Sequence, residues 1–88
     1  MEFEAMRDRI RRFVEGRFPA ARGAKDGDPL LRNGVVDSLG VLDVVAFLER
    51  EFGIAVVDDD LTAENFESLQ AMASYTRAKQ GGSLPGKL

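Results

Sequence analysis

Apolar side chains recur at helical spacing near both ends of the chain. In the N-terminal stretch they stand three or four residues apart, at Phe3, Met6, Ile10 and Phe13, with Val14 beside the last. This stripe predicts an amphipathic helix that ends near Gly16. In the C-terminal stretch a second stripe follows Ser68, a residue type favoured at helix N-caps, and consists of Leu69, Met72, Ala73 and Tyr75. The chain is therefore predicted to begin and end in helices.

The central stretch predicts a helix with two different faces, which starts at Ser38. Gly53 marks its end, because glycine readily takes the left-handed conformation of a C-terminal cap. One side is expected to face the core and carries Val41, Val44, Val45, Leu48 and Phe52. The other side mixes apolar and charged positions, namely Leu39, Leu42, Ala46, Asp43, Glu49 and Arg50. This second face is either a partner surface or additional core beneath other helices.

The connecting segments carry turn-forming residues. From Arg17 to Asn33, prolines and glycines interrupt every periodic pattern, which predicts a long loop held by Leu30 and Leu31. Such a loop is unusual in a compact domain unless it has a function or packs on the surface. After the central helix, residues 54–57 look extended but cannot form a sheet alone. A short helical turn is expected over residues 62–66, with Leu61 and Phe66 pointing inward.

Together these elements predict an all-α bundle of three main helices and one short helix, with a long loop between the first and the second. A single domain is expected over residues 1–80, followed by a flexible C-terminal tail at residues 81–88 that is rich in glycine. With 88 residues in total, the domain is close to the smallest size at which a core suffices without disulfides or metals.

Composition limits the chemistry of this domain. The chain contains no cysteine and no histidine, so it offers neither a thiolate metal site nor the commonest general base. These absences argue against a self-contained enzyme. The first four residues include two acids and no apolar run, which does not fit a signal peptide, and nothing approaches the length of a membrane span. We therefore expect a cytoplasmic protein that does not bind membranes.

Charge is distributed unevenly along the chain. The net charge is −3, yet residues 37–67 carry nine acidic side chains against one basic side chain, Arg50. Residues 1–36, by contrast, carry eight basic and six acidic side chains. An acidic middle segment repels nucleic acid and attracts basic protein surfaces, although a solvated acidic face without a partner is also common.

Several possible motifs fail on inspection. Residues 56–62 resemble the D-x-D-x-T nucleophile motif of haloacid-dehalogenase-like phosphatases, but that motif follows a strand of a large parallel sheet, which this chain lacks. As a calcium loop starting at Asp58, the segment would place Ala63 and Leu69 where glycine and glutamate are required. Ser38 has neither a histidine to activate it nor a surrounding G-x-S-x-G motif, so it is not a hydrolase nucleophile.

The pair Asp37-Ser38 stands where the central helix is expected to begin. Either residue suits an N-cap, and that is the simpler interpretation of the two residues alone. The same position also suits a covalent tether, because a phosphodiester on the Ser38 hydroxyl would lie beside free backbone N–H groups and the positive end of the helix dipole.

The wider sequence resembles carrier proteins of the acyl carrier and peptidyl carrier superfamily. The resemblance extends in order from about Leu30 to Tyr75, most of the chain. It includes Leu31 and Gly34, Asp37-Ser38-Leu39, the segment Leu48–Ile54, Val56, Asp58–Asp60, Leu61, and Asn65–Ser68. A lone D-S-L is a weak signal, whereas D-S-L with this helix, extended link and final helix at matching spacing is specific.

The resemblance implies a right-handed four-helix bundle in which Ser38 carries a 4′-phosphopantetheine arm. A separate phosphopantetheinyl transferase would attach this arm from coenzyme A with magnesium, and Asp37 would orient the site. The arm would supply the thiol that the chain lacks and hold acyl or aminoacyl groups as thioesters. The resemblance also implies a docking face for partner enzymes, made of Leu39, Gly40, Leu42, Asp43, Ala46, Glu49 and Arg50.

Two residues depart from the pattern of fatty-acid carriers. Gly40 stands where an acid is frequent, and Arg50 adds a cation to the docking face. Both reduce the docking charge and argue against a fatty-acid role. The pattern of residues 34–40, with residues 64–68 later, looks more like free-standing carriers of specialised pathways, such as polyketide or nonribosomal peptide synthesis. We expect the carrier to be a monomer. Its partners would be a loading (adenylating) enzyme and downstream synthases or tailoring enzymes. The alternative is a carrier-like module that stays unmodified and docks partners non-covalently.

Overall fold

The computed structural model describes residues 2–81 and contains four α-helices within that range. Three are long: α1 (Phe3–Arg17), α2 (Ser38–Phe52) and α4 (Leu69–Gln80), whereas α3 (Ala63–Phe66) has a single turn. Two 3₁₀ turns lie in the connections, η1 (Pro19–Ala21) and η2 (Asp58–Asp60). The predicted all-α fold of three main helices and one short helix is confirmed. The predicted tail is described only at its first residue, since residues 82–88 lie outside the described range.

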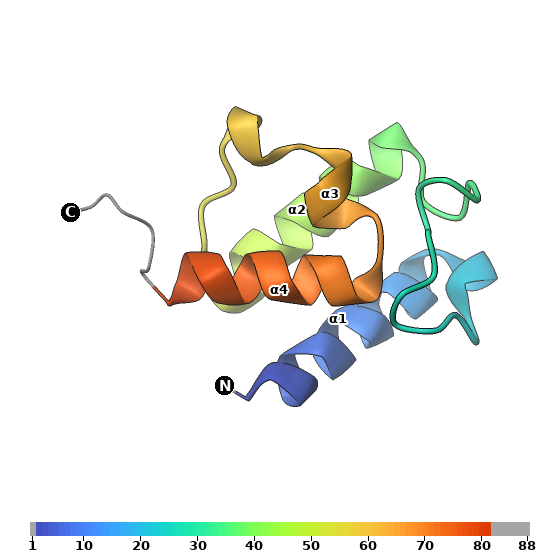
Figure 1. Cartoon of the computed structure of the whole chain (residues 1–88), viewed down its shortest axis with the longest axis horizontal. Coiled ribbons are helices and arrows are strands. Elements are labelled where there is room, and N and C mark those ends of the chain that lie inside the picture. Colours follow the sequence, from blue (N-terminus) through green and yellow to red (C-terminus); the bar gives the residue numbers. More distant parts are fainter. Residues whose placement is uncertain (1, 82–88) are drawn as a thin grey trace.

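The three long helices share one apolar core. Figure 1 shows α1 below α4, α2 passing behind α4, and α3 standing over the beginning of α4. The predicted stripes supply most of the buried side chains, which are Met6, Ile10 and Val14 of α1, Val44, Leu48 and Phe52 of α2, and Leu69, Met72, Ala73 and Tyr75 of α4. Burial of large aliphatic and aromatic side chains stabilises the bundle by about 1.5–3 kcal/mol for each side chain. No described helix is both long and apolar enough to cross a membrane.

The long loop between α1 and α2 is packed onto the bundle. Its Leu30 and Val36 are completely buried, and the Val36 N–H donates to the Leu30 carbonyl at 3.0 Å. The Leu30 N–H in turn donates to the carbonyl of Glu67, at the junction of α3 and α4, at 2.7 Å. Leu31, expected to hold the loop together with Leu30, is only partly buried.

Two boundaries and one orientation differ from the sequence-based expectation. α1 continues to Arg17, one residue beyond the expected end, and α3 begins at Ala63 with Thr62 as its N-cap. The prediction that Leu61 points inward is wrong, because 41% of this residue is exposed. Leu61 is the C-cap of η2, and the neighbouring Asp60 is held against α4, which leaves Leu61 at the surface. Phe66 is buried, as predicted.

Asp60 fastens η2 to α4. Its carboxylate accepts a hydrogen bond from the Tyr75 hydroxyl at 2.7 Å and forms an ion pair with Lys79 at 3.0 Å. Its backbone carbonyl accepts a hydrogen bond from the Asn65 amide at 2.8 Å. The bonds from Tyr75 and then Lys79 lower the pKa of Asp60, whereas burial and then the bond to Asp60 raise the pKa of Tyr75. Asp60 therefore connects three separate segments.

The Asp60 anchor predicts a pH-dependent loss of stability. Because the pKa of Asp60 is lower in the folded state, its stabilisation is present above its ordinary value of 3.8 and is lost as the pH falls through the lowered value. We expect Asp60→Asn to reduce the free energy of unfolding by about 1–2 kcal/mol at neutral pH. Urea unfolding at several pH values measures this, and the difference from wild type should shrink below pH 3.8.

Asp59→Asn is the matched control for this experiment. Asp59 is the exposed neighbour of Asp60 in the same turn, and its side chain has no hydrogen-bond or ion-pair partner among the described residues. We expect its substitution to change the free energy of unfolding by less than about 0.5 kcal/mol. Equal losses in the two variants at neutral pH would contradict the assignment of Asp60 as the anchor.

Candidate functional site

Ser38 is the first residue of α2 and leaves its hydroxyl available. Asp37, and not Ser38, is the N-cap: its backbone is extended and its Oδ1 accepts a hydrogen bond from the Gly40 N–H at 2.7 Å. The Ser38 side chain is exposed and has no hydrogen-bond partner among the described residues. Because Asp37 performs the capping, the Ser38 hydroxyl is free to react while the start of the helix remains intact.

A groove of about 500 Å³ opens beside Ser38. One wall comes from α2 and the end of the preceding loop, and the other from the segment that contains η2 and α3. The lining is mainly apolar and includes Leu31, Val36, Val41, Leu42, Leu61 and Phe66. Asp37 is the only charged residue among those that line the groove, and its carboxylate is already engaged as the helix cap. The Ser38 groove, as we call it, therefore suits uncharged, apolar material next to a reactive hydroxyl.

Most of the predicted docking residues lie on one exposed face of α2. Leu39 is 75% exposed and Leu42 55% exposed, and Ala46, Glu49 and Arg50 are exposed as well. The carboxylate of Glu49 accepts a hydrogen bond from the Val56 N–H at 2.9 Å, which fixes the link that follows α2. Asp43 lies at the edge of this face and forms an ion pair with Arg17 at 2.6 Å.

Gly40 does not belong to this exposed face. It is buried beneath the ring of Phe18, and a Cβ atom at this position would lie 2.7 Å from the Phe18 Cε1 and 3.2 Å from the Asp37 Oδ1. Arg17 stacks over the same ring, with its guanidinium carbon 5.2 Å from the ring centroid. Gly40 is therefore a packing position, and the expectation that it contributes to a docking surface is corrected.

Sequence reasoning missed the contribution of Arg17 and Phe18. Both fall at the junction of α1 and the long loop, where no periodic pattern marks a contact with α2. The available signal was Gly40 itself, since a glycine inside a helical pattern often marks the close approach of another segment. Phe18 packs against the first turn of α2 at Gly40, and Arg17 pairs with Asp43 in the second turn.

The described residues contain no group of three or more acidic side chains placed to hold a metal ion. Asp60, the second acid of both the phosphatase-like and the calcium-like pattern, is bound to Tyr75 and Lys79. Asp58, the first acid of both patterns, and Asp59 between them are exposed. Their carboxylates have no hydrogen-bond or ion-pair partner within the described chain. The exposed Ser38 hydroxyl, the Asp37 cap and the apolar groove lie together at the start of α2.

The Phe18–Gly40 contact predicts that the effect of Gly40→Ala on stability depends on whether the Phe18 ring is present. In the wild-type background, Gly40→Ala forces the Phe18 ring or the Asp37 cap to move, and we expect it to be destabilising by about 1 kcal/mol. In a Phe18→Ala background the ring contact is gone and only the 3.2 Å contact with the Asp37 Oδ1 remains. Gly40→Ala should then cost less, and alanine should become as stabilising as glycine or better by up to about 1 kcal/mol. A double-mutant cycle of urea unfolding measures the coupling. Identical effects of Gly40→Ala in both backgrounds would show that the ring does not constrain this position.

Comparisons with known proteins add no identification to this geometry. No model of a known protein family matches the chain, and no curated protein matches it significantly. The Ser38 groove is therefore characterised by its own residues alone.

Proposed function

We propose that the protein is a stand-alone carrier that holds acyl or aminoacyl groups as thioesters on a 4′-phosphopantetheine arm attached to Ser38. The observation that carries this proposal is an exposed, unpartnered serine hydroxyl at the first position of a capped helix, beside an apolar groove. The arm supplies the thiol for thioester formation. The pathway is one of specialised natural-product synthesis, and the carrier itself is not an enzyme.

The residues around Ser38 suit a phosphate ester. In the attachment step, Ser38 Oγ attacks the pyrophosphate of coenzyme A, a new O–P bond forms, and the bond to the departing nucleotide breaks. The hydroxyl proton passes to a base of the transferase, because the chain has no histidine to receive it. The first N–H groups of α2 and the helix dipole then stabilise the phosphodiester anion, while Asp37 keeps the first turn wound.

The groove suits an uncharged acyl group better than an aminoacyl group. Its walls consist mainly of leucine, valine and phenylalanine side chains, and its single carboxylate is occupied as a cap. An aminoacyl thioester carries an ammonium group, and burying an unpaired charge against an apolar wall is costly. Tethering in turn raises the effective concentration of the cargo at each partner enzyme.

Mass spectrometry tests the attachment directly. Incubation with coenzyme A and a broad-specificity phosphopantetheinyl transferase should add the mass of one phosphopantetheinyl group to the wild-type protein. Ser38→Ala should remain unmodified, because the attacking oxygen is gone. Ser74→Ala is the matched control, since Ser74 is an exposed serine on α4, and it should be modified as fully as wild type. A folded wild-type protein that gains no mass would refute the proposal.

The alternative function is a module that binds partner enzymes non-covalently without modification of Ser38, and it predicts a different result. If the wild-type protein stays unmodified and Ser38→Ala binds the same partner enzymes with unchanged affinity, the chain acts as a non-covalent docking module. If binding or turnover by the partner enzymes requires the modified Ser38, the carrier role is supported. Circular dichroism of each variant establishes that the compared proteins are folded.

A further inference from the structure

The acidic side chains of residues 37–67 fall into two groups in the structure. Five of the nine are engaged within the chain. Asp37 caps α2, Asp43 pairs with Arg17, Glu49 binds the Val56 N–H, Glu51 pairs with Arg9, and Asp60 binds Tyr75 and Lys79. The other four carboxylates have no side-chain partner within the described chain, and all are exposed: Asp58, Asp59, Glu64 and Glu67. Unpaired negative charge is thus concentrated on η2, on α3 and just after it.

The unpaired negative charge therefore does not lie on the exposed face of α2. On α2 the Asp43 carboxylate is compensated by Arg17, and Glu49 is followed directly by the cation of Arg50. The exposed face of α2 is therefore mainly apolar and close to neutral. Three of the unpaired carboxylates, Asp58, Asp59 and Glu64, flank the lining residues Leu61 to Ala63 in the sequence, and we call them the acidic rim.

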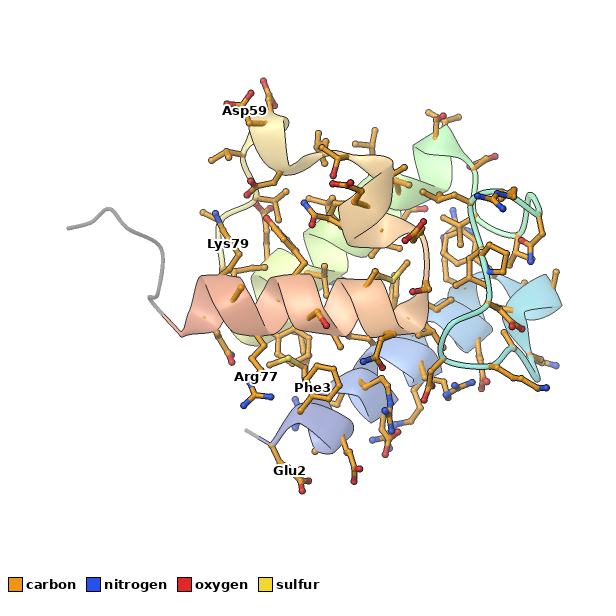
Figure 2. All side chains as sticks on the ribbon, in the orientation of Figure 1. Glu2, Phe3, Asp59, Arg77 and Lys79 are labelled. Atoms are coloured by element: carbon orange, nitrogen blue, oxygen red, sulfur yellow. The ribbon has the colours of Figure 1, made fainter. Side chains whose placement is uncertain are left out.

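Exposed apolar side chains lie in the Ser38 groove or close in sequence to Ser38 and to the acidic rim. Four large hydrophobic residues are more than 40% exposed within the described chain, and all lie in or next to the Ser38 groove or the acidic rim: Leu39, Leu42, Val57 and Leu61. Leu42 and Leu61 line the groove from opposite walls. Leu39 follows Ser38 in the chain, and Val57 precedes Asp58. Figure 2 shows Asp59 at the outer end of the η2 turn, on the opposite side of α4 from Arg77 and Phe3.

We propose that enzymes acting on Ser38 dock with basic side chains over the acidic rim and apolar side chains over Leu39, Leu42 and Leu61, rather than through charges on α2. This inference rests on the proposed carrier function. Charge complementarity requires a basic partner, and the exposed leucines require that it also offer apolar surface. Nucleic acid and anionic lipid do not fit, because their phosphates would be repelled by the rim.

Pantetheinylation kinetics provide the first test. The rim variant combines Asp58→Asn, Asp59→Asn and Glu64→Gln. The control variant combines Glu2→Gln, Glu4→Gln and Asp8→Asn, which removes the same charge from three exposed, unpartnered acids of the α1 region. We expect the rim variant to raise KM for the carrier about tenfold with little change in kcat, because each exposed ion pair contributes modestly and all are made before the chemical step.

Salt dependence sharpens this first test. KM of wild type and of the control variant should rise with sodium chloride, whereas KM of the rim variant should be nearly insensitive to it. Equal KM values for the rim and control variants, whether raised or not, would overturn the inference, because the effect would then follow net charge and not the position of the rim. Thermal unfolding of both variants shows whether they remain folded.

A peptide probe tests the surface without any modification of Ser38. Two synthetic amphipathic helices share one leucine face and carry either lysine or glutamate on the other face. In NMR titrations of the isotope-labelled apo-protein, the lysine peptide should shift the amide signals of Leu42, Leu61 and Glu64. It should bind the control variant like wild type and the rim variant about tenfold more weakly.

The two tests separate the two proposals. If the lysine peptide binds at the rim while wild type is never pantetheinylated, the docking surface stands and the carrier function fails. If wild type is pantetheinylated but the lysine peptide shifts signals elsewhere, or binds both variants equally, the carrier function stands and the docking surface fails.

Discussion

Burial of Leu30 and Val36 is the constraint on which the position of the site depends. Both side chains are fully buried and belong to the core that the three long helices share. Their backbone groups bond to each other and to the carbonyl of Glu67, so the end of the loop is held at the junction of α3 and α4. Because Val36 immediately precedes Asp37, the residue that starts α2 cannot move independently of the core.

This arrangement reconciles a rigid core with an exposed reactive group. Within three positions the chain passes from the buried Val36 to the exposed Ser38, with the capping carboxylate of Asp37 between them. The hydroxyl is therefore placed accurately without being enclosed. Phe18 adds a second contact to the same helical turn at Gly40, and Arg17 pairs with Asp43 in the next turn. The proposed attachment role requires both properties, since a modifying enzyme would have to reach the hydroxyl and find it in one orientation.

The sequence predicted the elements of this fold well because its helices are amphipathic and clearly punctuated. The stripe Leu69, Met72, Ala73 and Tyr75 is buried, Ser68 caps α4 by accepting from the Ala71 N–H, and Gly53 takes the left-handed conformation that ends α2. Each of these features is set by neighbours in the sequence, so local patterns suffice to find it.

Features that depend on contacts between distant segments were not predicted. The burial of Gly40 needs Phe18, the charge of Asp43 is compensated by Arg17, and the exposure of Leu61 follows from the anchoring of Asp60 to α4. None of these pairings is visible in a single sequence. They decide which of the many acids and leucines remain at the surface, and hence what a partner meets. For the same reason the position of Ser38 was predictable, whereas the character of its surroundings was not.

The two walls of the Ser38 groove are held in place by different contacts, and they should therefore differ in stiffness. The α2 wall belongs to a helix of four turns that is packed into the core along its length. The opposite wall is carried by the 3₁₀ turn η2 and the single turn of α3, which are held by Phe66, Asn65 and the Asp60 contacts with α4. A helix of one turn has little stability of its own. The α2 wall therefore has more support than the other, so a displacement of α3 would change the width of the groove without moving Ser38.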